Sequence, residues 1–207
     1  MGMKRADCTG VILAGGLNSR MNGFNKGLLE LEGRTVLGRT LSLFEELFEE
    51  TLVVSNTPEA LLDYDVRIVS DIFPERCSLA GIHSALFHAN TPWVFVAPCD
   101  NPFLSKEMVE LVLSHRSEGA TCVVPETTKG LEPLCAAYAK ETLGLAESRL
   151  KEECFKIRSL FRKKRTRYVP EAAIRRIDPD LLSFFNINTP EEYAWAQAMM
   201  KEKHSSD

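Results

Sequence analysis

The 207-residue sequence lacks the features that mark several classes of protein. No apolar run is long enough to span a membrane, and residues 1–9 lack the apolar core of a signal peptide. The formal net charge is −4, which argues against the broad basic field of a nucleic-acid-binding protein. We therefore expect a cytoplasmic protein with no membrane or nucleic-acid partner.

The cysteine and histidine residues are also poorly spaced for metal binding, disulfide bonds or nucleophilic catalysis. The six cysteines form no C-x-x-C pair, which argues against a zinc site or a disulfide framework and favours reduced, mostly buried thiols. His83 and His88 lie five residues apart on a predicted helix, a poor spacing for one shared ligand. We expect both histidines to be structural or solvated, and we find no Ser-His-Asp or Cys-His arrangement.

The sequence does contain a regular alternation of short apolar runs and amphipathic stretches. This alternation predicts an α/β fold with three layers, α/β/α, in which helices cover both faces of a mostly parallel sheet. Thr57-Pro58-Glu59 is predicted to begin one helix, and Thr189-Pro190-Glu191-Glu192 is a capping box that opens the last one. Strands are predicted at residues 10–14, 51–55, 66–70, 93–97, 120–124 and 134–138, and helices at 35–48, 79–89, 105–116 and 140–152.

Polar residues follow four of the predicted strands. The first strand is followed by a glycine-rich loop, the second by Asn56, the third by Asp71 and the fourth by Asp100. In open α/β sheets, ligands bind beyond the carboxyl ends of the strands. The sequence therefore predicts a ligand site at this one edge of the sheet.

The first of these loops, residues 12–27, reads ILAGGLNSRMNGFNKG. It is neither a P-loop nor a dinucleotide fingerprint, because it has no G-K-[ST] and no G-x-G-x-x-G. Gly15 and Gly16 allow close approach of the backbone to a ligand, while Arg20 and Lys26 supply a guanidinium fork and a point charge for phosphate. Taken alone, the loop is equally well explained as a turn with two solvated cations.

Asp100 follows its strand between Pro98 and Pro102. A carboxylate at that position can ligate Mg²⁺, which usually takes one or two carboxylates together with substrate phosphates, although aspartate is also common in plain turns. A glycine loop, two cations and a metal carboxylate together make the set that phosphoryl or nucleotidyl transfer requires.

These motifs, in their order along the chain, resemble those of the molybdenum cofactor guanylyltransferase (MobA) family of the nucleotidyltransferase-like superfamily. The resemblance includes the loop just described, Asn56, Asp71, Ser78-Leu79-Ala80-Gly81, Pro98-Cys99-Asp100-Asn101-Pro102 and Asn186-Ile187-Asn188-Thr189-Pro190-Glu191-Glu192. It extends over nearly the whole chain and is weakest between about 125 and 180.

The resemblance implies a Rossmann-like nucleotidyltransferase fold and an enzyme that joins GMP from GTP to molybdopterin, with Mg²⁺, releasing pyrophosphate. It implies one domain over residues 1–207, with a nucleotide-binding half at about 8–104 and an acceptor half at about 105–203. The implied partners are GTP, molybdopterin and other proteins of molybdenum-cofactor biosynthesis or acceptor proteins, and we expect a monomer.

Site roles follow from the same resemblance. The residues implied to act in catalysis are Arg20, Lys26 and Asp100, of which Asp100 holds the metal. Nucleotide contacts are implied for Leu13, Ala14, Gly15, Gly16, Lys26, Asn56, Asp71 and Asp100. The acceptor side is assigned to Asn186 and Asn188. Apart from the resemblance, the basic run that contains Lys156 and Arg158 is explained either as a solvated face or as a cradle for the pterin phosphate or for an acidic protein partner.

This sequence departs from the family pattern at three places in the loops. Asn22 replaces a glycine, Asn25 replaces an aspartate, and Cys77-Ser78 replaces Gly-Pro. None of these changes removes a phosphate- or metal-binding group, but they leave the base preference open. A cytidylyltransferase acting on the same or a related cofactor, and a non-catalytic nucleotide- or cofactor-binding protein on the same fold, stay as alternatives.

Overall fold

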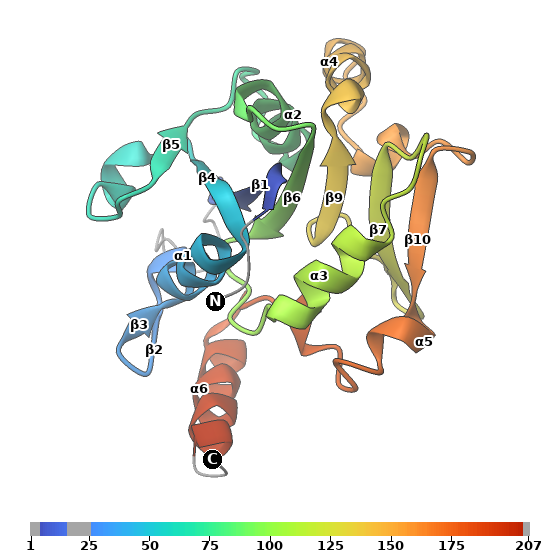
Figure 1. Cartoon of the computed structure of the whole chain (residues 1–207). Helices are drawn as coiled ribbons and strands as arrows, with labels where there is room; N and C mark the ends of the chain where they lie inside the picture. Colours follow the sequence, from blue (N-terminus) through green and yellow to red (C-terminus); the bar gives the residue numbers. More distant parts are fainter. Residues whose placement is uncertain (1–4, 16–25, 205–207) are drawn as a thin grey trace.

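The structure is a computed structural model that describes residues 5–15 and 26–204, and its centre is one mixed β-sheet (Figure 1). The strands lie side by side in the order β10-β7-β9-β6-β1-β4-β5, and a short β8 pairs with β7. Their bounds are β1 Arg5–Leu13, β4 Phe48–Val54, β5 Arg67–Val69, β6 Trp93–Pro98, β7 Cys122–Thr127, β8 Gly130–Leu131, β9 Ala136–Ala139 and β10 Thr166–Pro170.

Strand direction sets where the loops meet. β5, β4, β1 and β6 are parallel neighbours, so their carboxyl ends lie at one edge of the sheet. β9 runs antiparallel between β6 and β7, and β10 is parallel to β7. The connection from β7 to β9 spans only residues 128–135, which is too short for the crossover that a parallel pair needs. The predicted α/β fold with a mostly parallel sheet is confirmed.

Helices cover both faces of the sheet, as the three-layer prediction requires. α1 (Val36–Leu47) and α3 (Lys106–Ser114) pack on one face, and α2 (Ser78–His88) and α4 (Leu143–Lys151) pack on the other (Figure 1). Strand alternation explains the two cores, because Ile12 of β1 joins the first core while Val11 and Leu13 join the second.

Gly10 shows how tightly α1 lies on the sheet. A Cβ at this position of β1 would come within 2.5 Å of Phe48 Cδ2 and 2.7 Å of Phe44 Cδ2. Phe44, Phe48 and Phe95 form an aromatic cluster over it, with ring centroids 5.1 to 6.3 Å apart. The strand therefore needs a residue without a side chain at this point.

The C-terminal helix α6 (Pro190–His204) packs against a small hairpin of β2 (Glu30–Leu31) and β3 (Arg34–Thr35). A third hydrophobic cluster holds the helix and the hairpin together. Its buried residues are Leu31, Val36, Phe103, Ile187 and Ala196. The predicted capping box is confirmed, since Thr189 Oγ1 accepts from Glu192 N at 3.2 Å and Glu192 Oε2 accepts from Thr189 N at 3.0 Å. This docking brings the segment before α6 to the end of β6.

Three local predictions need correction. Thr57 begins only a 3₁₀ turn, Pro58–Leu61, and its side chain makes no capping hydrogen bond. The predicted helix at 140–152 is divided into a 3₁₀ turn, Lys140–Thr142, and α4. The basic run also contains structure that was not predicted, namely a 3₁₀ turn at Ile157–Leu160 and the edge strand β10. The remaining short helices are Lys26–Leu28, α5 (Glu171–Ile174) and Leu182–Phe184.

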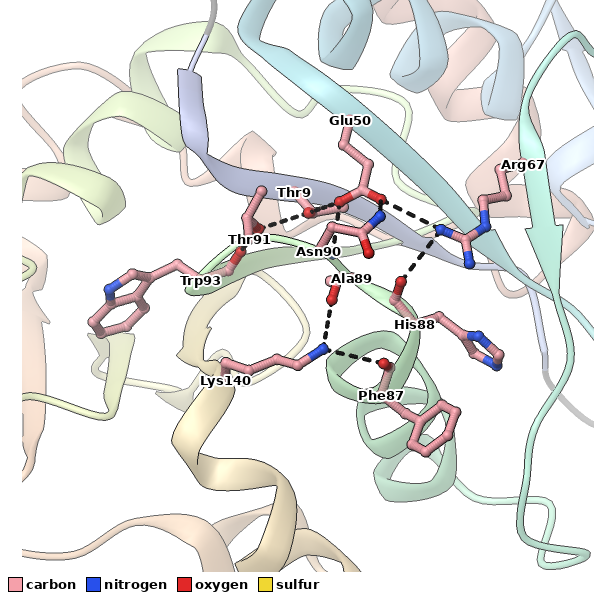
Figure 2. A network of polar contacts seen from close by, with 10 residues as sticks. All are labelled: Thr9, Glu50, Arg67, Phe87, His88, Ala89, Asn90, Thr91, Trp93 and Lys140. Carbon is pink, nitrogen blue, oxygen red and sulfur yellow. Dashed lines mark hydrogen bonds and ion pairs between the residues drawn. The ribbon is translucent and has the colours of Figure 1, made fainter.

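A polar network ties the parallel strands together at the opposite edge of the sheet, where the strands begin (Figure 2). Glu50 Oε2 accepts hydrogen bonds from Thr9 Oγ1 at 2.5 Å and from Asn90 N at 3.0 Å, and its Oε1 accepts from Asn90 Nδ2 at 2.6 Å. Arg67 of β5 reaches the same carboxylate at 3.4 Å. Lys140 caps the end of α2 by donating to the carbonyls of Phe87 and Ala89.

None of the described helices is both long and apolar enough to cross a membrane. All six cysteines are free; Cys8, Cys122 and Cys135 are buried, and the other three are half-buried. His83 is 3% exposed and packs edge-on against Phe73, with ring centroids 4.9 Å apart. Its environment on α2 is that of a core residue, in agreement with the structural role expected for it.

Candidate active site

A cavity of about 260 Å³ lies where β1, β4 and β6 end, which is the edge that the sequence predicts. The predicted site residues that line it are Leu13, Gly15, Lys26, Asp71, Asp100, Asn186 and Asn188. Gly16 and Arg20, as well as the departures Asn22 and Asn25, lie outside the described residues. Segments from both ends of the chain therefore meet in one hollow.

Asp100 lies just beyond β6 and faces this cavity with a side chain that is 19% exposed. Its backbone carbonyl accepts a hydrogen bond from Ile187 N at 3.0 Å, which fixes the segment between Asn186 and Asn188 beside it. Burial raises the pKa of the Asp100 carboxyl above its usual range, although the nearby Lys26 ammonium opposes this shift. The site thus holds a desolvated carboxylate that a cation would stabilise.

Lys26 is the first residue of a 3₁₀ turn and is held in place on two sides. Its Nζ donates to Asn188 Oδ1 at 2.8 Å and lies 3.8 Å from Asp100 Oδ2. Asn188 is itself anchored, because its backbone N–H donates to Glu192 Oε2 at 2.6 Å. The capping box of α6 therefore positions the asparagine that positions the lysine.

Asn56 and Asp71 bind each other across the ends of β4 and β5. Asn56 Nδ2 donates to Asp71 Oδ2 at 2.7 Å, and Asp71 N donates to Asn56 Oδ1 at 3.1 Å. Asp71 lines the cavity, and its Oδ1 is buried with no hydrogen-bond partner among the described residues. Burial raises the pKa of Asp71, while the hydrogen bond from Asn56 opposes this shift. One carboxylate oxygen is therefore left for a ligand donor.

Some backbone groups at the end of β1 are already hydrogen-bonded within the protein. Ala14 N donates to Val54 O at 2.8 Å, and Leu13 O accepts from Cys99 N at 3.1 Å. The N–H of Gly15 has no hydrogen-bond partner within residues 5–15 and 26–204. Of the backbone donors expected to contact a nucleotide, Gly15 is therefore available, whereas Ala14 is not.

A second cavity, of about 570 Å³, adjoins the first, and both are lined by Asn186 and Asn188. Its other walls come from the β7–β8 hairpin, from the loop before Asn186 and from α6, with Glu132, Phe185 and Trp195 among them. Lys156 and Arg158 are exposed, and neither is among the described residues that line the two cavities. Arg158 instead lies beside the hairpin, with Nη2 3.9 Å from where a Cβ on Gly130 would be.

Several lining residues were not identified as site residues from the sequence. Cys77, Cys99 and Leu134 line the first cavity. Burial raises the pKa of the Cys99 thiol to about 12, which makes it a protonated wall residue rather than a nucleophile. Glu132 and Trp195 of the second cavity carry no local signal, because three separate segments meet only in the fold.

The donor set is suited to one kind of metal site. Within the described ranges, no group of three or more His, Cys, Asp or Glu side chains is placed to enclose an ion. A desolvated carboxylate next to a lysine, with no such group around it among the described residues, is instead the arrangement expected for Mg²⁺ that arrives with substrate phosphates.

Comparison with known proteins agrees with this geometry. Residues 10–168 match the family model described as the MobA-like NTP transferase domain. The chain belongs to the MobA-like NTP transferase family. A molybdenum cofactor guanylyltransferase from Desulfosudis oleivorans is 37% identical over 193 residues, which cover 93% of this chain and 96% of that protein.

Solved structures give the same result at the level of the fold. The molybdopterin-guanine dinucleotide biosynthesis protein A from Archaeoglobus fulgidus superposes with a TM-score of 0.81 at 27% identity, covering 94% of this chain and 99% of that one. A 4-diphosphocytidyl-2C-methyl-D-erythritol synthase from Anaerococcus prevotii superposes with a TM-score of 0.69 at 17% identity, covering 95% and 96%. The latter likeness shows the nucleotidyltransferase fold alone.

Proposed function

We propose that this protein transfers GMP from GTP to the terminal phosphate of molybdopterin and releases pyrophosphate. Support comes from the molybdenum cofactor guanylyltransferase that is similar over nearly its whole length and from the site itself. The observation that carries the proposal is the placement of Lys26, Asp71 and Asp100 around one cavity that adjoins a second, larger one. Two substrates can thus meet at the residues that both cavities share, Asn186 and Asn188.

The reaction joins two anions and needs no protein nucleophile. A phosphate oxygen of molybdopterin forms a bond to the α-phosphorus of GTP, and the bond from that phosphorus to the bridging oxygen of the β-phosphate breaks. A phosphate monoester has a second pKa of about 6, so it is largely dianionic at neutral pH and requires no general base. The protein must instead offset repulsion, and Lys26, held by Asn188, is placed to do so.

We further propose that Asp100 holds Mg²⁺ together with the phosphates of GTP. Asp100 suits this role because its carboxylate is mostly buried, so that its negative charge is costly, and a bound cation would offset that cost. When bound, Mg²⁺ supplies Lewis-acid stabilisation of the phosphate oxygens. We assign Arg20 to the triphosphate, Leu13, Gly15 and Gly16 to the nucleotide, and Asp71 to a donor on the nucleoside through its free Oδ1. In this proposal Asn56 acts by orienting Asp71.

The two halves expected from the sequence fit this scheme. Most of the first cavity comes from residues 13–100, while every described residue that lines the second lies between 127 and 199. We propose that the nucleotide-binding half, about 8–104, holds GTP and that the acceptor half, about 105–203, holds molybdopterin. Because neither Lys156 nor Arg158 is among the described residues that line the two cavities, we assign the acceptor phosphate to Asn186 and Asn188 rather than to them.

Nucleotide binding tests the base preference without any turnover. GTP with Mg²⁺ at a hundredfold its dissociation constant stabilises the folded state by about 2.7 kcal/mol. Each kcal/mol shifts the Tm of a chain of this size by about 2–4 °C, so thermal denaturation should show a rise of several degrees. ATP and CTP should shift the Tm less at the same concentration. A larger shift with CTP would favour a cytidylyltransferase, and no shift with any nucleotide would contradict the proposal.

A further inference from the structure

The second cavity differs in character from the first. Its apolar wall includes Phe184, Phe185, Trp195 and Met199, and its polar residues include Glu132. The rings of Trp195 and Phe185 lie 4.7 Å apart at 43°, and Phe103 packs against both. Trp195 nevertheless keeps 41% of its surface exposed. A large aromatic surface that the protein leaves uncovered at a cavity wall can stack on a planar ring of a ligand.

The charges of the two cavities orient an acceptor that has an anionic end. The first cavity contains Lys26 beside two carboxylates, Asp71 and Asp100, and the charge of Asp100 is offset by the Mg²⁺ proposed there. The second is lined by three carboxylates, Glu132, Asp180 and Glu192, and by one lysine, Lys129. A phosphate is therefore favoured toward Lys26 and disfavoured in the second cavity. The end of the ligand that enters the second cavity should be uncharged, aromatic and rich in N–H donors.

Of the three carboxylates, Glu132 is the one available for such donors. Glu192 is engaged by the backbone N–H groups of Asn188 and Thr189, and Asp180 is exposed to solvent. Glu132 is half-buried, and among the residues that the structure describes its carboxylate accepts no hydrogen bond and forms no ion pair; only the Lys129 ammonium attracts it from a distance. A half-buried carboxylate without a hydrogen-bond donor is costly to keep in a fold unless a ligand supplies one.

We propose that Glu132 binds the aminopyrimidinone edge of the pterin ring, which stacks on Trp195. That edge presents two adjacent N–H donors, from the ring nitrogen N3 and the 2-amino group, and they match the two oxygens of one carboxylate. The inference rests on the proposed function, because it names which part of that acceptor the second cavity holds. Glu132 is a specificity-determining residue in this scheme, since it contacts the ring and not the reacting phosphates.

The test compares two ring systems that differ at one group. A pterin and the matching lumazine, for example 6-hydroxymethylpterin and 6-hydroxymethyllumazine, are titrated with the full-length protein and followed by ligand fluorescence. The lumazine carries a 2-oxo group where the pterin carries the amino donor, so it faces Glu132 with an acceptor. The protein should bind the pterin about tenfold or more tightly than the lumazine, as expected for a hydrogen bond to a charged group.

The variant Glu132→Gln should remove this preference, because its amide offers only one acceptor oxygen. Its KM for molybdopterin should rise by a similar factor of about ten, while its Tm shift with GTP and Mg²⁺ stays unchanged. Glu126→Gln, an exposed position of β7 outside both cavities, is the matched control and should behave like the parent protein.

The two possible failures can be told apart. A parent protein that binds the pterin and lumazine equally, or a Glu132→Gln variant that keeps the preference, overturns this inference, whether or not GMP is transferred. A Glu132-dependent preference for pterin in a protein that transfers no nucleotide supports the inference and overturns the proposed function. A protein that binds neither ring overturns the inference as well.

Discussion

At the residue scale, the site is assembled from side chains that are costly to bury alone. Burial raises the pKa of both Asp71 and Asp100, and within residues 5–15 and 26–204 each has one neutralising or hydrogen-bonding side chain nearby, Asn56 for the first and Lys26 for the second. A fold that keeps such groups gives up stability unless a ligand satisfies them, and this is typical of binding and catalytic sites. The same reasoning identifies Glu132 in the second cavity, where burial also raises the carboxyl pKa.

The first residue-scale prediction concerns Asp100→Asn. Because the pKa of Asp100 is higher in the folded state than in the unfolded chain, its charge costs stability as the pH rises through the unfolded-state pKa, and the cost is complete above the folded-state pKa. The neutral variant should therefore have a higher Tm than the parent at pH 7 without ligand, while its turnover falls by about 100-fold or more. The gain in Tm should shrink as the pH falls and should disappear below about 3.9, where the aspartate becomes neutral in both states.

Differential scanning calorimetry over a range of pH, with a pyrophosphate-release assay beside it, measures both effects. Asp65→Asn, at an exposed carboxylate, is the control and should change neither the Tm nor turnover appreciably. An Asp100→Asn variant that turns over normally would rule out the metal assignment, and a lower Tm at neutral pH would contradict the account of its burial.

Some site residues can be read from the chain and others cannot. Three of them can be placed from the sequence: Asp71 and Asp100 follow predicted strands, and Lys26 ends the glycine-rich loop after the first strand. Because ligands of α/β sheets bind beyond the carboxyl ends of the strands, these residues are expected to meet there, and they line one cavity. Glu132, Phe185 and Trp195 come from a hairpin, a loop and a helix, and no spacing in the sequence links them. These three residues come together only because α6 packs against the rest of the protein, and that packing depends on tertiary contacts.

At the scale of elements, some strands of the sheet could be predicted from the sequence and others could not. The apolar strands at its centre were predicted because their buried residues are consecutive, as Val11, Ile12 and Leu13 show. β10 was missed because it is an edge strand of mixed character, with Thr166 and Val169 buried and its other residues at least partly exposed. The sequence predicts a helix beginning at Thr57, but only a 3₁₀ turn forms there. A cap residue followed by a proline is not enough for a helix without an apolar face to bury.

The element-scale prediction concerns Glu50, which joins β4 to β1, to β5 and to the turn before β6 (Figure 2). Burial alone would raise the pKa of Glu50, but hydrogen bonds from Thr9 and Asn90 outweigh it and the pKa is lowered. Its stabilising contribution is therefore present at neutral pH and is lost as the pH falls through the folded-state pKa, below 4.5. Glu50→Gln should cost about 1 kcal/mol of unfolding free energy at pH 7, allowing for partial solvent screening.

Urea denaturation at several pH values checks this contribution. The difference between the parent protein and Glu50→Gln should be largest near neutral pH and should disappear at low pH, with nucleotide-induced Tm shifts unaffected because the network lies at the far edge of the sheet. Glu49→Gln, the exposed neighbour on β4, serves as the control. A difference that is the same at every pH would show that the carboxylate charge has no part in the network.

At the scale of the whole molecule, the fold separates two tasks. The parallel half of the sheet gathers the residues that we propose face the nucleotide at its carboxyl edge, and the antiparallel strand β9 joins it to the half that carries the second cavity. Residues 186–188 connect the two, because Asn186 and Asn188 line both cavities while Ile187 and Asn188 bind Asp100 and Lys26. We propose that a guanylyl group is transferred at this junction.

Nucleotide incorporation into molybdopterin tests that claim most directly. The purified protein is incubated with Mg²⁺, molybdopterin and each of the four common nucleoside triphosphates labelled at the α-phosphate, and label transfer is followed together with pyrophosphate release. The account predicts that label moves from GTP to molybdopterin with matching release of pyrophosphate, and that the other three nucleotides transfer little. Transfer from CTP as fast as from GTP, or no transfer from any nucleotide, would contradict it.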